Sequence, residues 1–600
     1  MKLNWTVYLL LPLAASGQAA RADSQQPNLI VTANRMPQST SDILAPYTII
    51  SAKQIAQMQA KSITDVLAMQ PGVDVRANGG IGQPSSISIR GGTSKQTLIL
   101  IDGMRAMSAS TGSGSLDFLP ASMVERIEII RGPRAAQYGA DAMNGVVNII
   151  TKPSYAEQVN RLIVGVGQHD YWQSGWRFVH SLGEQTQFQA NISAKGSTGY
   201  NFKPDSTPAH NYGYSNRQAL FTLSHALNSS WSADGEAIIN RGHSQYNGYG
   251  VAAEAQKTLI QQFYSGTLNY DIDHYSSHWN MNYNVDDSRS MSSSYSRYVT
   301  QRYAASWLNS WQLNERWQVD AGLDSRQVNL SKSSVDFNQT KRYNIGGYSS
   351  VGYRMGAYQL DASLRQDHNQ RYGNNTNYSF AGGWQYLPRQ QIKLSYATAF
   401  HAPSFNDLFS PLNFGYQGNP NLKPEKSKNI ELGLKGTLGR VHYEWNIYRT
   451  QYRDLIEITP DFSTSDNISQ ARITGSEMIV KFALGPIHQQ LSYTYMDSQN
   501  TRTHKVLTYR PWNNAKWLAD WSLTPKLNVH TGIHWNGHRF ASSTQRLPSY
   551  WTVDVAAGYQ LTPSLKLAVS AANLLDRHYQ TTYQYMASGL QADLTAQYDF

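Results

Sequence analysis

The fold of this chain is indicated by the stretch Leu590-Gln591-Ala592-Asp593-Leu594-Thr595-Ala596-Gln597-Tyr598-Asp599-Phe600. Apolar side chains occupy every second position, and Gln, Asp or Thr stands between them. Successive side chains of a β-strand point to opposite sides, so this period of two predicts a strand with one apolar and one polar face.

The same period recurs from about residue 154 onward. It is clear in three stretches, 188–195, 358–365 and 565–571. A soluble β-sandwich and a membrane barrel both give such alternation, but about 450 residues far exceed a sandwich domain. At about 10 residues per tilted spanning strand, plus turns and loops, this length allows roughly 20 to 24 strands. The sequence therefore predicts a transmembrane β-barrel.

The composition agrees with a barrel. Charged residues make up only 15% of the chain, while aromatic residues reach 12% with 38 Tyr, which suits lipid-facing strands with interfacial aromatic girdles. The mean hydropathy of -0.49 argues against a helical membrane protein. The chain has no Cys, so disulfides and thiolate metal sites are excluded. The formal charge of +10 is scattered, which disfavours nucleic acid as a partner.

The first 40 residues carry two signals. Residues 1–22 are expected to be a secretory signal peptide, with a charged start at Lys2, a short apolar core and the cleavage site Ala20-Arg21-Ala22. Residues 23–40 contain the short β-prone run 29–33. An extended apolar peptide at a flexible end is suited to being added as a strand to a partner's sheet.

Residues 41–153 have a mixed α/β pattern. Ser51 and Ser62 each precede a polar partner by three residues, as in a capping box. Short strands are expected at 97–101, 127–130 and 146–150, and long glycine-containing loops at 78–86 and 108–115. A barrel of this size has a lumen wide enough to need a plug. We therefore predict an all-β membrane barrel of about 22 antiparallel strands (154–600) with an N-terminal α/β plug domain (41–153) in its lumen.

Several motifs resemble those of TonB-dependent outer-membrane receptors. The run 29–35 resembles their Ton box. The other matching stretches are 131–139 with 145–151 in the plug, and 396–405, 418–427 and 573–579 in the barrel. The resemblance extends from Asn28 to Phe600, and an apolar, alternating final strand that ends in Phe is similar to the assembly signal of outer-membrane barrels.

Within that family, the stretches 29–35, 77–91 and 100–105 are most similar to the cobalamin transporters. The resemblance implies a monomer in the lipopolysaccharide-containing outer membrane of a Gram-negative bacterium, inserted by the barrel assembly machinery. It implies TonB-driven import of cobalamin, with a ferric-siderophore receptor as the alternative. The C-terminal domain of TonB would pair with the Ton box, namely Leu29, Ile30, Val31, Thr32 and Ala33.

The resemblance also implies which residues bind the substrate. The plug positions lie in two apical loops, and a barrel arginine joins them; the set is Pro84, Ser86, Thr93, Thr111, Gly112 and Arg510. Thr93 stands where the family pattern has Asn, and Pro84 where it has Leu. Ser86 and Thr93 could equally be ordinary turn residues.

Calcium is a further point of difference. Cobalamin transporters order their outer loops with calcium held by an Asp-rich cluster. The corresponding loops here, 198–201 and 210–214, carry Asn and Tyr instead. Calcium prefers several charged oxygen ligands, so we expect weak or no calcium binding, and no other cofactor.

Other interpretations are less favoured. Arg131, Arg134 and Glu128 are expected to form an ion-pair network between plug and barrel wall. His401 could suggest a haem ligand, but the plug has no His and the first in the chain is His169. No G-x-S-x-G or H-E-x-x-H motif supports an enzyme. A passive porin would be blocked by the plug, and the Ton box could be merely an ordered N-terminal arm.

Overall fold

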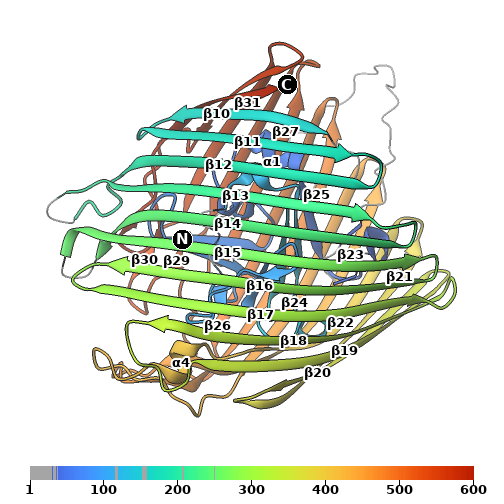
Figure 1. The fold of residues 1–600 in the computed structure, drawn as a ribbon, viewed down its shortest axis with the longest axis horizontal. Helices are drawn as coiled ribbons and strands as arrows, with labels where there is room; N and C mark the ends of the chain where they lie inside the picture. The colour runs from blue at the N-terminus through green and yellow to red at the C-terminus, as the bar shows by residue number, and fades with distance from the viewer. Residues whose placement is uncertain are drawn as a thin grey trace, which may run out of the picture.

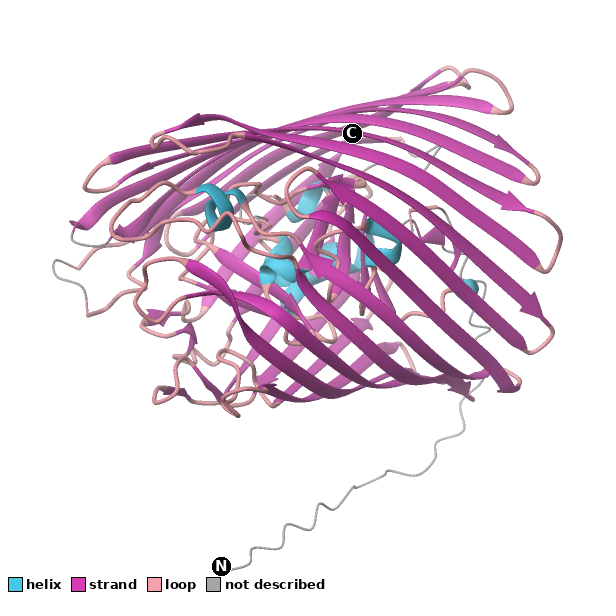
Figure 2. Ribbon diagram, turned by 90° about the horizontal axis from the view of Figure 1, so that it is seen from below, coloured by secondary structure: helices cyan, strands magenta, loops and turns pink. Residues whose placement is uncertain are grey.

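The chain folds into a closed antiparallel barrel of 22 strands that surrounds a plug (Figure 1). The computed structural model describes residues 30–31, 35–36, 38–114, 116, 119–151, 158–205, 209–248 and 251–600. Figure 2 shows the plug helices inside the ring of strands. The predicted fold class is confirmed.

The barrel strands follow one another around the wall almost in chain order. They are β10 (Val159–Gly167), β11 (Tyr171–Leu182), β12 (Thr186–Tyr200), β13 (Tyr212–Ala226), β14 (Trp231–Gly248), β15 (Val251–Ile272), β16 (Tyr275–Met291), β17 (Tyr295–Gln312), β18 (Trp317–Ser333), β19 (Lys341–Met355), β20 (Tyr358–Asn369), β21 (Gly373–Leu387), β22 (Gln390–His401), β23 (Glu425–Leu438), β24 (Val441–Ile458), β25 (Ser465–Leu484), β26 (Ile487–Asn500), β27 (Asn513–Ser522), β28 (Leu527–Asn536), β31 (Tyr550–Gln560), β32 (Leu565–Ala572) and β35 (Gln591–Asp599).

The alternating stretch at 590–600 closes the barrel. Its strand β35 pairs with β32 on one side and with β10 on the other, where Leu162 lies opposite Tyr598. The backbone N–H of Phe600 donates to the carbonyl oxygen of Asn160 at 2.9 Å. Each barrel strand therefore has two neighbours, which removes the unpaired edges that a membrane does not tolerate.

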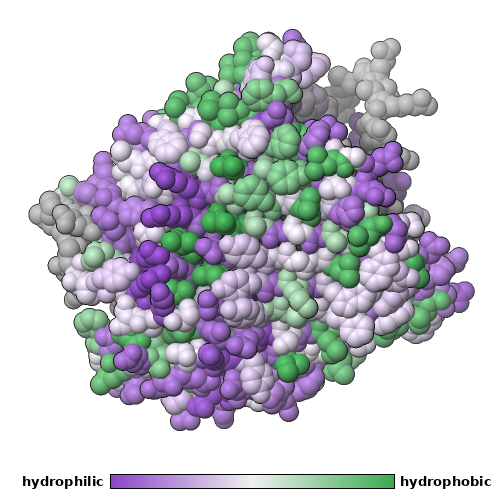
Figure 3. Space-filling view, viewed as in Figure 1, coloured by the Kyte–Doolittle hydropathy of each residue, from purple (hydrophilic) through white to green (hydrophobic). Residues whose placement is uncertain are grey.

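The wall has its apolar side chains outside and its polar side chains inside. On β20, Leu364 is 57% exposed, while Arg365 and Asp367 are 1% and 0% exposed. Figure 3 shows apolar side chains spread over the centre of one face, with hydrophilic ones gathered toward its left and lower margins. This inverted polarity is what a lipid-facing wall with a polar interior requires. No helix among the described residues is long and apolar enough to cross a membrane.

Loop length distinguishes the two ends of the barrel. One end has tight turns such as 356–357 and 485–486, and the other has long loops, including 402–424, 501–512 and 573–590. Outer-membrane barrels have short periplasmic turns and long extracellular loops, so the long loops mark the extracellular end. These loops carry α4 (Phe405–Phe409) and the small hairpins β29 (Arg539–Phe540) with β30 (Arg546–Leu547) and β33 (Gln580–Thr582) with β34 (Tyr585–Met586).

The plug is built on a five-stranded sheet with the order β3-β8-β9-β6-β7. Its strands are β3 (Tyr47–Ser51), β6 (Thr97–Ile101), β7 (Met104–Arg105), β8 (Arg126–Arg131) and β9 (Gly145–Ile150), and a separate hairpin joins β4 (Val73–Ala77) to β5 (Ser85–Ile89). The helices are α1 (Ala52–Met58), α2 (Ile63–Ala68) and α3 (Ala135–Tyr138), with single turns η1 (Thr40–Asp42), η2 (Ser94–Gln96) and η3 (Ala121–Met123). The side chains of Ser51 and Ser62 cap α1 and α2, as their spacing predicted.

Candidate functional site

Three plug segments, 78–84, 91–96 and 108–114, contact the extracellular end of the barrel, the first on one arc of the wall and the other two together on another. The first is held at β12–β14, where Gln83 Nε2 donates to the carbonyl oxygen of Gln245 at 2.6 Å. A Cβ on Gly79 would lie only 2.6 Å from the ring of Phe202, and the φ of Gly79 is +123°. This close approach requires glycine.

The second segment is held by the loops 402–424 and 501–512 and by the first residue of β23. Lys95 Nζ lies 3.4 Å from Asp407 Oδ1, and Gln96 Nε2 donates to Glu425 Oε2 at 2.7 Å. Asp407 also caps α4 together with Ser404. A plug side chain therefore contacts the residue that orders a short extracellular helix.

The third segment meets the same loop. Its backbone accepts two hydrogen bonds from α4: Phe405 N–H donates to Ala109 O at 3.3 Å, and Asn406 N–H donates to Ser110 O at 3.0 Å. Gly112 has a φ of +77°, and a Cβ on it would lie 3.7 Å from Lys95 Cδ. The second and third segments are thus neighbours, while the first lies on another arc.

The structure spreads the predicted substrate residues over these segments. Pro84, Thr93 and Thr111 are exposed, and Gly112 is half-buried. Ser86 lies inside β5, where it pairs with Arg76 across the hairpin. The segment that carries Thr93 therefore lies beside the segment that carries Gly112, and Pro84 and Ser86 lie apart from both. Contact of these residues with a substrate stays a prediction.

Arg510 connects the barrel to the plug. Its Nε donates to Gly91 O at 2.8 Å, and its Nη2 donates to Gly92 O at 3.3 Å. Burial, together with the charge of Arg76, lowers the pKa of Arg510 to about 10. Three of its donors are used by backbone carbonyls, including Thr508 O, so in this state Arg510 supports the second apical segment from outside.

Two plug arginines pair with carboxylates of the wall. Arg90 makes a bidentate pair with Glu431, at 2.8 and 3.2 Å, and Arg131 Nε lies 2.8 Å from Glu477 Oε1. Burial opposes the charge of Arg90, but Glu431 and Glu477 outweigh it and raise its pKa above the ordinary value. Buried pairs of this kind fix orientation, because breaking one leaves an uncompensated charge.

The predicted network between plug and wall is correct for Arg131, while the ion pair expected of Arg134 is not found among the described residues. Glu128 pairs within the plug, with Arg126 Nε at 2.8 Å. Arg134 is buried, but no carboxylate of the described residues lies within ion-pairing distance of it. Arg134 lines the same cavity as Arg131, where Glu431 and Asp361 of the wall favour its charge without forming an ion pair. Sequence reasoning missed Arg90, Glu431 and Glu477, although acids on the lumen-facing positions of β23 and β25 were a usable signal.

The Ton box lies only partly within the described residues. Ile30 and Val31 form β1 (Ile30–Val31), which pairs antiparallel with β2 (Gln38–Ser39). Leu29, Thr32 and Ala33 lie outside the described residues. Beyond them, Arg35 Nη1 lies 2.7 Å from Asp324 Oδ2 on β18 and donates to Gln137 O at 3.1 Å. The chain is thus anchored to both wall and plug four residues after Val31.

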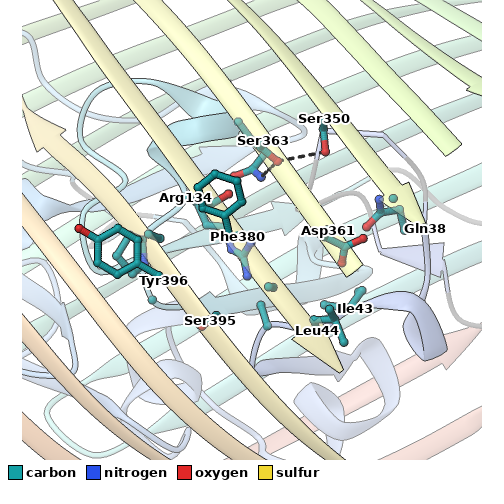
Figure 4. Close-up of a pocket in the computed structure, with 18 of the residues that line it drawn as sticks. Gln38, Ile43, Leu44, Arg134, Ser350, Asp361, Ser363, Phe380, Ser395 and Tyr396 are labelled. Atoms are coloured by element: carbon teal, nitrogen blue, oxygen red, sulfur yellow. Dashed lines mark hydrogen bonds between the residues drawn. The ribbon is translucent and has the colours of Figure 1, made fainter. Parts of the chain in front are cut away.

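A cavity of about 80 Å³ lies beside this anchor, at the periplasmic side of the plug. Figure 4 shows Ser350, Asp361 and Ser363 on neighbouring barrel strands, with Ile43 and Leu44 of the N-terminal segment across from them. Arg354 pairs with Asp42 at 3.4 Å on the same side. The segment that follows the Ton box therefore packs against the barrel wall and leaves part of the space between them empty.

No group of three or more His, Asp or Glu residues in the described part of the chain could hold a metal ion. The loops at 198–201 and 210–214 make aromatic contacts instead, with the rings of Phe202 and Tyr212 stacked at 4.2 Å. Weak or absent calcium binding remains a prediction.

Family comparisons agree with this architecture. Residues 153–574 match the family model described as "TonB dependent receptor-like, beta-barrel", and residues 39–146 match "TonB-dependent Receptor Plug Domain". The chain belongs to the TonB-dependent receptor family. It is therefore a receptor of the Gram-negative outer membrane that interacts with TonB, and its family is one of transporters rather than enzymes.

Two curated relatives of this TonB-dependent receptor match it over nearly their whole length. The chain is 31% identical to "Vitamin B12 transporter BtuB" of Photobacterium profundum, with all of both chains covered. It is 30% identical to "Vitamin B12 transporter BtuB" of Vibrio vulnificus, with 95% of both covered.

Solved structures share the fold. The siderophore receptor PirA from Acinetobacter baumannii aligns with a TM-score of 0.80 at 20% identity, covering 92% of this chain and 98% of that one. The ferric enterobactin receptor PfeA from Pseudomonas aeruginosa, solved as a mutant in complex with enterobactin, aligns with a TM-score of 0.80 at 21% identity, covering 93% and 100%. At these identities, the likeness concerns the fold alone.

Proposed function

We propose that this receptor imports cobalamin across the outer membrane and that TonB supplies the energy through the Ton box. The observation that carries this proposal is the full-length similarity, at 31% and 30% identity, to two proteins named as vitamin B12 transporters. Similarity across plug and barrel together supports a shared substrate better than a match to either domain would.

The proposed binding surface is the extracellular face of the plug. Thr93 and Thr111 are exposed there, on two neighbouring apical segments that the loop 402–424 supports. Cobalamin would rest on these segments and on Pro84 and Ser86, through shape and hydrogen bonds. Arg510 would act on the substrate by holding Gly91 and Gly92 in place.

Signalling to the periplasm requires that the ligand bind two states of the plug with different affinity. The pairing of β1 with β2 involves only two residues on each strand. A strand of the TonB C-terminal domain could replace β2 by β-augmentation. We propose that ligand binding weakens the Arg35 anchor and so frees residues 29–33 for TonB.

The deciding experiment is equilibrium binding to the purified receptor in detergent, with cyanocobalamin and ferric enterobactin as ligands, each with calcium and with chelator. Tight binding of cyanocobalamin that is unchanged by the chelator is expected. Binding of ferric enterobactin in place of cyanocobalamin would overturn the substrate and leave the family unchanged.

A pair of variants tests the binding surface. Thr93→Trp should block the apical surface and weaken cyanocobalamin binding at least about tenfold, since one bulky side chain there displaces several contacts. Thr562→Trp, on an exposed turn at the periplasmic end, is the matched control and should bind like the unmodified receptor. Equal affinity in both variants would show that the substrate lies elsewhere.

We also propose that the receptor is a monomer. Size-exclusion chromatography with light scattering tests this.

A further inference from the structure

Four arginines surround a cavity of about 40 Å³ beneath the third apical segment. Arg105 comes from the plug strand β7, and Arg302, Arg326 and Arg342 come from the adjacent wall strands β17, β18 and β19. Asp141 is the one carboxylate among the described residues that line this cavity. Positive charge is therefore in clear excess there.

The strand register explains the cluster. Arg302 lies opposite Val328 on β18, and Val328 lies opposite Arg342 on β19. Arg326 is two residues from Val328, so its side chain points to the same face. Neighbouring strands lie about 4.8 Å apart, so the three side chains share one small area of the lumen.

Asp286, Asp324 and Asp407 lie near enough to favour the charge of one arginine each, but only Asp141 forms an ion pair with the cluster among the described residues. Arg302 donates to the carbonyl oxygens of Arg105 and Met107, both at 2.7 Å, and its buried Nε has no partner in the described part of the chain. Arg342 donates to Pro403 O at 2.5 Å and lies over the ring of Phe405. Asp141 is shared between Arg105 and His401, each at 2.9 Å.

Arg326 is the least compensated of the four. Among the described residues it makes neither a hydrogen bond nor an ion pair, although it faces Arg105 and Arg302 closely enough to affect both. Burial, with the charges of Arg326 and Arg302, lowers the pKa of Arg105 to about 9. Buried His401 lines the same cavity, and its Nε2 has no hydrogen-bond partner among the described residues.

We propose that Arg105, Arg302, Arg326 and Arg342 form a binding pocket for a small oxyanion, such as a phosphate group. A buried cluster of guanidinium groups is costly unless an anion compensates it, and the guanidinium fork matches phosphate and carboxylate oxygens. A water needs about 10–15 Å³ in such a cavity, so the space accepts roughly three waters or one oxyanion. Ser108 and Gly112 form its upper side, so the bound anion would brace the third apical segment.

Inorganic phosphate is the probe that tests the pocket. The full-length receptor in detergent at pH 7 is titrated with sodium phosphate, with sodium chloride at equal ionic strength as the salt control, and its melting temperature is followed by tryptophan fluorescence. Phosphate should raise the melting temperature beyond the chloride effect, as any ligand of the folded state does. The phosphorus NMR line of phosphate should broaden in the presence of the receptor. No broadening, or equal effects of phosphate and chloride, would overturn the proposal.

Variants locate the effect. Arg326→Gln and Arg342→Gln should each weaken phosphate binding at least about tenfold, because charge-assisted hydrogen bonds are lost. Arg289→Gln, which loses a half-exposed pair with Asp287 at 2.7 Å, is the matched control and should bind phosphate normally. Unchanged phosphate binding by Arg326→Gln would refute the assignment, and Arg326→Lys replaces that variant if it does not fold.

The anion could be free or part of the substrate. Cyanocobalamin carries a phosphodiester that dicyanocobinamide lacks. A comparison of these two ligands rests on the proposed function, whereas the phosphate titration does not. Displacement of phosphate by cyanocobalamin but not by dicyanocobinamide would assign the pocket to the substrate's phosphodiester. Displacement by neither would assign it to free phosphate.

Discussion

The guanidinium of Arg35 lies 2.7 Å from the carboxylate of Asp324, inside the barrel and four residues beyond the described part of the Ton box. Arg365 holds the same carboxylate through two hydrogen bonds, at 2.8 and 2.9 Å. The φ of Arg35 is +75°, a left-handed conformation that non-glycine residues rarely adopt. A favourable ion pair therefore holds an unfavourable backbone conformation, which suits a contact that must be released.

Removal of this anchor should favour the released state. For Arg35→Ala, we expect tighter binding of the isolated TonB C-terminal domain without substrate, by about tenfold or more. A charged hydrogen bond contributes about 1.5–3 kcal/mol, and apparent affinity follows the population of the competent state. Surface plasmon resonance with immobilised TonB domain measures this.

The control for that experiment is Arg289→Ala. This variant removes the ion pair between Arg289 and Asp287, which lies far from the N-terminal segment. It should bind the TonB domain like the unmodified receptor. Equal tightening in both variants would mean that general loosening, and not the Arg35 anchor, regulates access.

The second prediction concerns the pairing of the Ton box itself. In β1, Val31 lies opposite Gln38. Val31→Pro removes a backbone donor and fixes φ, so it should prevent strand addition by TonB. Uptake of radiolabelled cyanocobalamin by cells should be abolished, while binding to de-energised cells stays nearly intact. Val31→Ala keeps the donor and is the control; loss of binding and uptake together in Val31→Pro would contradict the mechanism.

The barrel could be predicted from the sequence because its rule is local. Successive wall residues face lipid and lumen in turn, so an alternation of apolar and polar residues, such as that at 358–365, shows directly which side chains face the lipid. The caps at Ser51 and Ser62 and the strand Thr97–Ile101 were predictable for the same reason, since each depends on a few neighbouring residues.

The contacts between plug and wall could not be predicted in this way. The pairs Arg35–Asp324 and Arg90–Glu431 join residues 289 and 341 positions apart. Which lumen-facing acid meets which plug arginine depends on the strand register and on the rotation of the plug in the barrel. Neither is encoded in a local pattern, so the sequence predicts wall ion pairs for both Arg131 and Arg134, and the described residues show one only for Arg131.

The third prediction concerns acid stability. Asp141 accepts from His401 and Arg105, each at 2.9 Å. Burial disfavours its charge, but these partners hold its pKa below the ordinary value. Such a carboxylate stabilises the folded state above its unfolded pKa, near 4, and this stability is lost as the pH falls through the folded pKa.

Asp141→Asn should therefore lower the melting temperature at pH 7, and its difference from the unmodified receptor should shrink as the pH falls below about 4. Thermal unfolding in detergent at pH 7, 5 and 3 measures this. Asp336→Asn, at an exposed loop position, should show little difference at any of these pH values. A difference for Asp141→Asn that is constant from pH 7 to 3 would exclude the charge as its cause.

The fourth prediction distinguishes the role of Arg510 from that of another arginine in the same loop. Lysine cannot donate to Gly91 O and Gly92 O with the fixed geometry of a guanidinium. Arg510→Lys should loosen the second apical segment and weaken cyanocobalamin binding about tenfold, the equivalent of one lost charged hydrogen bond. Arg502→Lys, in the same loop and bonded to Ile468 O at 2.7 Å, should bind normally. Equal affinities for the two variants would assign Arg510 no role in binding.

The last prediction tests the orientation of the wall in the membrane. Leu364 lies near the middle of β20 on the lipid-facing side, and Gln366 lies on the same side but nearer the extracellular end. An arginine on the lipid face costs about 2–4 kcal/mol at the midplane and about 0–1 kcal/mol near the interface. Leu364→Arg should therefore reduce folding into lipid vesicles, measured by urea titration, more than Gln366→Arg does. Both changes introduce the same side chain on the same face, so they differ only in membrane depth. An equal loss of folding would mean that the assigned midplane is wrong.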